Sequence, residues 1–351
     1  MLALDADSDA CLGLVAGEVW TRPGRITIPH AKRPLEERES RRWLSTAEQA
    51  KAALAAAACV TVIDDREGDI YDKWASVSAQ NFDLLTRSMH DRALADGGSL
   101  YAAAAALPIA QVATIDLTAR ADRPARQAEL SLRFGRVTIK RPQGSAPALP
   151  KSVELTVIEV VEQAPPAGAE PLHWRLLTTH AAADAAAAWR IVNWCRKRWT
   201  IEQFFRLVKT QGLQLEDSRL ETADRLLKLT AIAAKAAVIT LQLVQARDGR
   251  SAEPATLAFD DRQVEVLAAF AAKYRGRTAL QRNPHPAKSL ACGLDHRQAR
   301  RMGRLSANQA RPNHNAARPR ILPRRRPSLD RAQRCVNQLV SHHRDYDSLT
   351  G

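Results

Sequence analysis

The spacing of apolar residues changes period several times along the first half of the chain. Apolar side chains alternate with polar ones at 2–4 and 11–20, which predicts two strands joined by an acidic turn around Asp7 to Asp9. Residues 59–63 form a short run rich in β-branched side chains, which is typical of a buried central strand. The other elements predicted here are an Ala-rich helix at 43–58, a helix at 70–78 and a strand at 82–86. Strands and helices that alternate in this order predict a mixed α/β sheet.

The middle of the chain contains strand patterns alone, and helical patterns follow them. Period-two segments predict three consecutive strands, at 130–139, 153–161 and 173–178. Helical periodicity returns at 181–209 and again at 223–246. This order predicts an α/β core with a β insertion. The expected divisions are 1–125 for the first part of the core, 126–180 for the β insertion, 181–250 for the remaining core helices, 251–291 for a C-terminal region and 292–351 for a tail.

The charge balance indicates the class of partner. Lys and Arg outnumber Asp and Glu by 52 to 38, giving a net charge of +14, which favours a polyanionic partner such as DNA. No apolar run reaches the 18 or so residues of a membrane-spanning helix, and the first residues are acidic, unlike a secretory signal. We therefore expect a cytoplasmic protein without a membrane partner. The five cysteines are widely spaced and include no C-x-x-C pair, which indicates reduced thiols and no zinc site.

The tail differs from the rest of the chain. Residues 292–351 hold 13 Arg, no Lys and 4 acids, so a charge of +9 resides there. Periodic apolar faces almost vanish. Two interpretations stay open: a disordered arm that binds nucleic acid, and a segment translated in a shifted reading frame.

The helix predicted at 181–209 carries acidic and basic side chains on one face. At 100 degrees per residue, Cys195, Arg198, Glu202, Arg206 and Lys209 fall within a stripe of roughly 80 degrees. Each cation taken alone is typical of an ordinary surface residue. A carboxylate that binds a divalent metal beside cations that bind phosphate is, however, what an enzyme that cuts nucleic-acid backbones requires. The shared stripe favours this second interpretation.

Asp65 is the second candidate for the same site, because it follows the strand at 59–63. Functional side chains in α/β sheets often lie at the carboxyl ends of strands, although an Asp between a strand and a helix is commonly a helix cap. Asp65 and Glu202 together could hold Mg²⁺, which needs few protein oxygens. A two-metal phosphodiester site needs a third acid, and no convincing candidate is found; Asp5, Asp7 and Asp9 have the spacing of a solvated turn.

Trp174 has two interpretations. By default it is a strand aromatic in a core. If the β insertion contacts DNA, an exposed Trp at this position could stack on an extruded base, a contact that contributes about 1 to 3 kcal/mol.

Several short motifs, taken in order, resemble one family. D-R-E-G-D-I at 65–70, L-L-T at 176–178 and the R-x3-E-x6-K pattern of Arg198, Glu202 and Lys209 resemble the DDE transposases of the insertion-sequence-four family. Weaker matches are E-R-E-S-R-R-W at 37–43, G-L-Q-L-E-D at 212–217 and R-N-P-H-P at 282–286. The resemblance covers about residues 1–291.

The resemblance implies a fold, an activity and a set of site residues. It implies an RNase H-like core with a β insertion before the helix that carries the last catalytic Glu, and cut-and-paste cleavage and strand transfer of double-stranded DNA at transposon ends and targets. Asp65 and Glu202 would be the second and third acids that bind Mg²⁺ or Mn²⁺. The expected DNA-binding residues are Arg66, Arg87, Trp174, Arg198, Arg206 and Lys209, of which Trp174 would receive a flipped base.

Three departures from the family pattern change the expectation. The signature Tyr is Cys195 here, the first catalytic Asp is expected on a strand upstream of Met1, and the Arg-rich segment from Cys292 replaces the family's Trp-rich dimerisation region. We therefore expect a truncated and frame-shifted transposase copy that is inactive or very weak and lacks the usual homodimer region. One alternative is a protein that binds DNA ends or full-length partners and inhibits transposition without catalysis. Another, a stand-alone RNase H-like nuclease, would require a complete acid triad.

Overall fold

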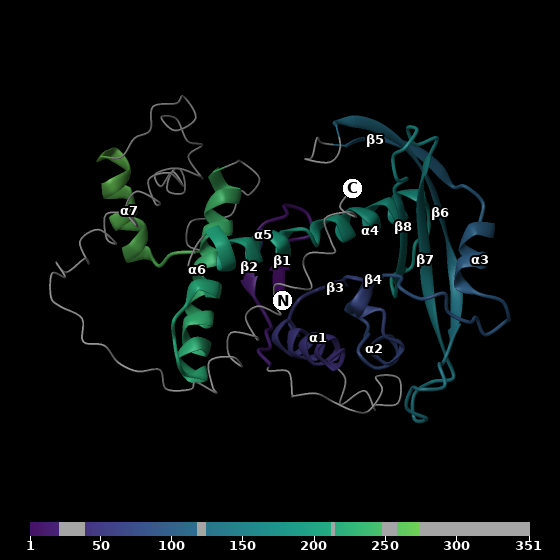
Figure 1. The fold of residues 1–351 in the computed structure, drawn as a ribbon, viewed down its shortest axis with the longest axis horizontal. Coiled ribbons are helices and arrows are strands. Elements are labelled where there is room, and N and C mark those ends of the chain that lie inside the picture. Colours follow the sequence, from purple (N-terminus) through teal and green to yellow (C-terminus); the bar gives the residue numbers. More distant parts are fainter. Residues whose placement is uncertain (21–38, 118–123, 212–214, 248–257, 274–351) are drawn as a thin grey trace, which may run out of the picture.

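The computed structural model describes residues 1–20, 39–117, 124–211, 215–247 and 258–273. Two sheets and several helices make up a mixed α/β fold, as the alternating pattern predicts (Figure 1). The strands are β1 (Leu2–Leu4), β2 (Cys11–Leu14), β3 (Val60–Asp64), β4 (Phe82–Arg87), β5 (Gln111–Leu117), β6 (Arg126–Lys140), β7 (Ser152–Gln163) and β8 (His173–Thr178). The main helices are α1 (Arg41–Ala53), α2 (Tyr71–Ser76), α3 (Leu100–Ala106), α4 (Ala185–Lys197), α5 (Thr200–Arg206), α6 (Ala223–Arg247) and α7 (Asp261–Lys273).

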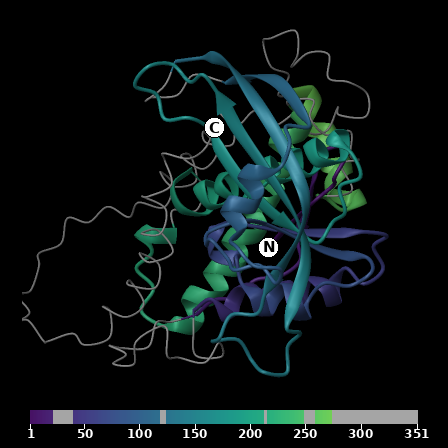
Figure 2. The same ribbon diagram turned by 90° about the vertical axis from the view of Figure 1, so that its right-hand side faces the viewer.

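The larger sheet has six strands in the order β3-β4-β8-β7-β6-β5. Among the strands in the described ranges, β3 and β4 pair in parallel, and the other neighbours in this sheet pair antiparallel. The strands predicted as an insertion continue the same sheet, because β8 pairs with β4 through Leu85 and Thr178. Figure 2 shows the long β6 and β7 twisting across this part of the molecule. The insertion strands thus extend the sheet that carries Asp65.

The prediction that residues 59–63 form a central strand is wrong. Among the described residues β3 lies at the end of the six-stranded sheet and pairs only with β4. A run of β-branched residues indicates that both faces of a strand are buried. It does not indicate how many strands pair with that strand. Here Val62 and Asp64 are buried on one face, whereas Ile63 packs on the other.

The two N-terminal strands form a sheet of their own. β1 and β2 pair antiparallel, with Leu2 opposite Leu14, around the predicted acidic turn. The Asp5 carboxylate closes this turn by accepting hydrogen bonds from the Ser8 amide and hydroxyl, each at 2.7 Å. The second strand ends at Leu14 rather than at Trp20. The hairpin packs on α6, where the Gln245 side chain accepts the Cys11 N–H at 2.8 Å.

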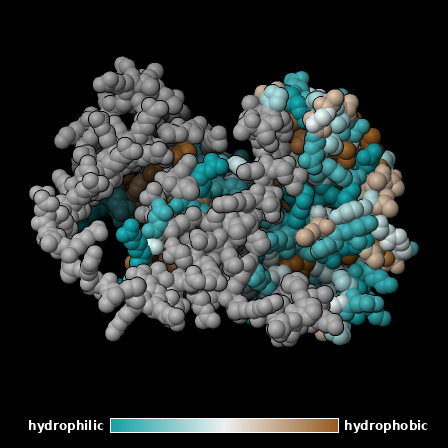
Figure 3. Space-filling model, viewed as in Figure 1, coloured by the Kyte–Doolittle hydropathy of each residue, from teal (hydrophilic) through white to brown (hydrophobic). Residues whose placement is uncertain are grey.

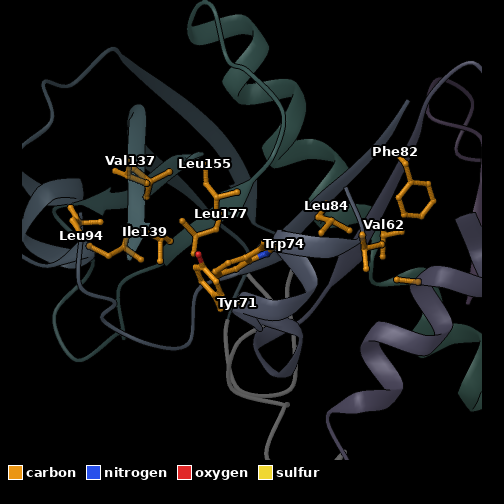
Figure 4. Packing of buried hydrophobic residues seen from close by; sticks show 14 of the residues in the cluster. Val62, Tyr71, Trp74, Phe82, Leu84, Leu94, Val137, Ile139, Leu155 and Leu177 are labelled. Carbon is orange, nitrogen blue, oxygen red and sulfur yellow. The ribbon is translucent and has the colours of Figure 1, made fainter. Parts of the chain in front are cut away.

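Three apolar clusters hold these parts together. One face of the sheet packs on α1, α2 and α3, with Tyr71, Trp74 and Leu177 near the centre (Figure 4). The opposite face packs on α4 through Ile191 and Val192. A third cluster joins the hairpin, α5 and α6. The helix α4 therefore covers the face of the sheet opposite to the one that packs on α1, α2 and α3.

The helix predicted over 181–209 is interrupted. The Asp184 carboxylate caps α4 by accepting the Ala187 N–H at 2.7 Å, and α4 ends at Lys197. Tighter turns follow, in which the N–H groups of Arg198 and Glu202 bond to the carbonyls three residues earlier. α5 then passes at Leu207 into a π-helical turn, Leu207–Gln211. The stripe expected from an unbroken helix is consequently split between α4 and α5.

Sequence periodicity did not predict α3, β5 or α7.

Residues 223–245 of α6 are long and apolar enough to be a candidate membrane-spanning helix, but the core helix of a soluble protein can have the same length and composition. One side of α6 packs in the third cluster, while Leu227 and Ile232 are exposed. On the face shown in Figure 3, hydrophilic residues predominate over the sheet, with hydrophobic residues scattered among them. The Arg-rich tail lies outside the described residues.

Candidate functional site

Asp65 follows the last residue of β3 and begins a short turn. Its Oδ1 accepts the Glu67 N–H at 2.9 Å and so caps the 3-10 turn Arg66–Gly68. The capping role that competes with a catalytic one is therefore present. The two roles are compatible, because the cap uses Oδ1 while Oδ2 faces the α4–α5 junction. The turn fixes the carboxylate at the carboxyl end of the strand.

Arg198 brings the two predicted acids into one site. Its Nη1 lies 3.5 Å from Glu202 Oε1 and 4.0 Å from Asp65 Oδ2. The side chains of Arg198, Asp65 and Glu202 are 17%, 15% and 11% exposed. Two carboxylates in such a partly buried position repel each other, and the guanidinium offsets this repulsion. Asp65 and Glu202, which lie far apart in the sequence, are thus neighbours around one cation.

Asp64 does not join this pair. Successive side chains of a strand point to opposite faces, so the Asp64 carboxylate enters the core under α2. There it pairs with Lys73, and the two side chains are 1% and 0% exposed. Burial raises the pKa of Asp64, and the positive charge of Lys73 opposes this effect. The direct neighbour of Asp65 in the sequence is therefore a core residue.

The other predicted cations are distributed around the acids. Arg87 ends β4, and both Arg87 and Arg198 act electrostatically on the Cys195 thiol. Burial raises the pKa of this thiol, while the two guanidinium charges oppose the rise. The Cys195 thiol, at the position where the resemblance expects Tyr, is therefore within electrostatic reach of two of the predicted DNA-binding residues. Arg66 is partly buried in the turn after Asp65.

The two cations beyond Glu202 differ in exposure. Arg206 ends α5 and is exposed. Lys209 lies in the π-helical turn, with its Nζ 5.6 Å from the centre of the Phe205 ring. Arg206 therefore shares α5 with Glu202, whereas Lys209 lies beyond the end of that helix.

Trp174 is largely buried. It lies on β8 opposite Val160, is 9% exposed, and belongs to the cluster under α4. This placement matches the default interpretation of a core aromatic. Stacking on an extruded base would require the indole or its neighbours to move, and that role stays a prediction.

Two of the quoted motifs are in direct contact. Arg42, from E-R-E-S-R-R-W, donates to Glu67 of D-R-E-G-D-I at 2.8 Å. Within the second motif, the Asp69 carboxylate accepts the Met89 N–H and the Arg92 Nε, each at 2.7 Å. The segments quoted for the resemblance thus support the turn that holds Asp65.

Sequence reasoning missed a polar cluster at the opposite ends of β3 and β4. His180 Nε2 lies 2.8 Å from Thr61 Oγ1, and His180 Nδ1 lies 3.4 Å from Asp83 Oδ2. The Trp194 ring lies 5.2 Å from the imidazole, centre to centre. Thr61 and Asp83 are paired in register, on the face that also carries Leu85. The period-two pattern could have placed these two together, but nothing in it indicates His180.

The donor set suits one hard divalent ion better than two. Asp65 and Glu202 supply the one or two carboxylates with which proteins usually hold Mg²⁺, and water and phosphate oxygens complete its six ligands. Across the described ranges, no group of three or more His, Cys, Asp or Glu side chains is arranged to hold a metal ion. Arg198 Nη1 lies beside both acids, so its positive charge would oppose that of an ion bound there. A search against models of known protein families finds no match for this chain.

Proposed function

We propose that this chain is a transposase-type protein with an RNase H-like core, which binds duplex DNA beside the carboxylates of Asp65 and Glu202. The position of Arg198 carries the proposal, because its Nη1 lies within 4.0 Å of both acids. If the α4–α5 junction were only a solvated surface, we would not expect the acid that follows β3, Asp65, to lie beside Glu202. The pairing matches the one that the motif resemblance implies.

The sheet order supports the RNase H-like part of the proposal. The resemblance expects a strand with the first acid, and that strand would pair beside the one that ends at Asp65. Within the described residues β3 is the end strand of its sheet, so its outer edge is the place for such a pairing. In the view of Figure 1, the hairpin of β1 and β2 lies beyond β3, on the side away from β4.

Each side chain has a task in this proposal. The turn cap fixes Asp65, and the i, i+4 contact with Arg198 orients Glu202. Mg²⁺ or Mn²⁺, when bound by these acids, would supply positive charge for attack on a phosphodiester bond. Arg87 and Arg206 would hold phosphates of the DNA backbone, since a guanidinium can bind a phosphate through two parallel hydrogen bonds.

We expect strand cleavage by this chain to be very weak or absent. Two acids meet at the site within the described residues, whereas two-metal cleavage usually requires three.

The same observation favours a second candidate function, a protein that occupies DNA ends and inhibits transposition without cutting. Incubation of the protein and Mg²⁺ with duplexes carrying the ends of its element separates these two. Cleavage that Glu202→Gln abolishes would show an active enzyme and contradict the expected inactivity.

DNA binding is tested by fluorescence anisotropy of a labelled duplex over a range of salt concentrations. Arg206→Gln is the test variant, and Arg136→Gln is the matched control, because Arg136 is an exposed arginine of β6 whose guanidinium pairs with Glu154. Loss of one phosphate contact should reduce the salt slope by about 0.9 and weaken binding, and the control should leave both unchanged. Equal behaviour of the two variants would contradict DNA binding at this site.

A further inference from the structure

Arg198 lies beside both of the acids that would share a metal ion. The same atom, Nη1, faces Glu202 Oε1 at 3.5 Å and Asp65 Oδ2 at 4.0 Å. All three side chains are less than a fifth exposed, so water screens their charges only in part. A divalent ion that contacts both oxygens would lie close to this nitrogen. A guanidinium and a divalent cation cannot share this position, because their repulsion in a partly buried site is strong.

We infer that Arg198 and a divalent cation compete for Asp65 and Glu202, and that metal binding releases the guanidinium to take a DNA phosphate. This inference rests on the proposed metal pair of Asp65 and Glu202. Without metal, Arg198 keeps the two carboxylates together. With metal, the ion takes over that task, and the arginine becomes available to an anionic ligand.

The surroundings of Arg198 give the released side chain a destination. Arg87 follows Thr86, the register partner of Asp64, so it ends β4 beside the strand end that leads to Asp65. Both Arg87 and Arg198 also act electrostatically on the Cys195 thiol. A guanidinium that leaves the acids therefore remains near a second guanidinium. Two planar cations with parallel N–H donors fit the oxygens of a backbone phosphate. The site would thus change from an internal ion pair to a phosphate-binding position one side chain away from the metal.

The exchange predicts that metal and DNA bind cooperatively. Metal binding already separates Arg198 from the acids. DNA that binds afterwards therefore does not have to supply the electrostatic free energy of this separation. By reciprocity, DNA must raise the affinity for metal by the same factor. A guanidinium that stays in place as a structural ion pair would produce no such coupling.

The test begins with the metal alone. Binding of Mn²⁺ to the full chain is measured by the loss of its free electron paramagnetic resonance signal, without DNA. Arg198→Gln should raise the affinity for Mn²⁺ by about ten-fold, within the usual range of coupling between sites. Arg206→Gln is the matched control, since Arg206 is four residues after Glu202 as Arg198 is four before it. This control should change the affinity less than about three-fold, because it removes charge without vacating the shared position.

The outcomes separate the inference from the function on which it rests. If Mn²⁺ binds and Glu202→Gln abolishes the binding, but Arg198→Gln and Arg206→Gln have equal effects, the exchange is wrong and the metal pair stands. If neither the native chain nor Arg198→Gln binds Mn²⁺, the metal pair falls and the exchange with it. Arg198→Lys keeps a cation between the acids and should bind Mn²⁺ like the native chain, which covers the case that the Gln variant fails to fold.

The second half of the test is the coupling. Affinity for a labelled duplex is measured with and without Ca²⁺, a hard divalent ion used as the probe. In the native chain Ca²⁺ should strengthen DNA binding by about five-fold or more. In Arg198→Gln this gain should disappear. A gain of equal size in the two proteins would overturn the release of Arg198 to phosphate.

Discussion

Asp64 and Lys73 form an ion pair that is sealed from solvent, with side chains 1% and 0% exposed. Asp64 directly precedes Asp65, so one residue of β3 enters the core while the next forms the candidate site. Gly68 packs against Asp64 from the turn that Asp65 begins. The buried pair therefore anchors the segment from which Asp65 faces Arg198.

Removing Lys73 should destabilise the protein strongly. Lys73→Met leaves the Asp64 carboxylate buried without a counter-charge, which costs about 3 to 5 kcal/mol. The free energy of unfolding is measured by urea denaturation, with the exposed Lys140→Met as control. The double variant Lys73→Met with Asp64→Asn should recover part of the loss. A Lys73→Met protein as stable as the control would refute the role of the pair.

Gly68 should not tolerate a side chain. A Cβ at this position would lie 2.4 Å from Asp64 Cβ and 2.8 Å from Asp64 Oδ2. Gly68→Ala should therefore displace the turn and cost about 1 to 3 kcal/mol, as overpacking of a core does. Gly144→Ala is the control, because nothing lies within 4 Å of its added Cβ. Equal denaturation midpoints for the two variants would show that the turn can shift freely.

The stability should fall as the pH drops below the usual pKa of histidine. Burial lowers the pKa of His180, the Asp83 carboxylate opposes this effect, and the charge of Arg190 adds to it. Below about pH 6.5 the unfolded chain binds a proton at His180 that the folded chain resists. Unfolding therefore becomes easier as the pH falls through about 6.5 toward the lowered pKa of the folded chain, and the contribution of His180 is fully present only above about pH 6.5.

Urea midpoints at several pH values measure this dependence. His180→Gln should reduce the slope over this pH range, whereas His90→Gln, an exposed control, should leave it as in the native chain. A slope that His180→Gln does not alter would assign the dependence to other groups.

Trp174→Ala distinguishes a core aromatic from a surface platform for a base. Because the indole is only 9% exposed, its removal should cost about 3 to 5 kcal/mol. Trp199, which is 38% exposed, provides a control whose truncation should cost less. A loss below about 0.5 kcal/mol for Trp174→Ala would indicate a surface residue. The measurement is guanidinium denaturation of both variants.

The sequence by itself determined most of the elements and the chemical character of the site. The apolar pattern predicted β8 at its observed bounds and the other long strands to within a few residues, because each strand carries buried apolar side chains along most of its length. Residue type and spacing selected Asp65, Arg198 and Glu202, since a contact between residues four apart follows from helical geometry alone.

Only the tertiary structure decided which strands are neighbours and which charges meet. Local periodicity contains no information on pairing, so β3 was expected in the centre of a sheet and lies at its edge in the described part of the chain. The tightened turn at Arg198 could not be read from an apolar pattern that continues through it. The approach of Asp65 to Arg198, the partnership of Asp64 with Lys73 and the cluster at His180 join distant segments, and they exist because α2 and α4 pack on opposite faces of one sheet.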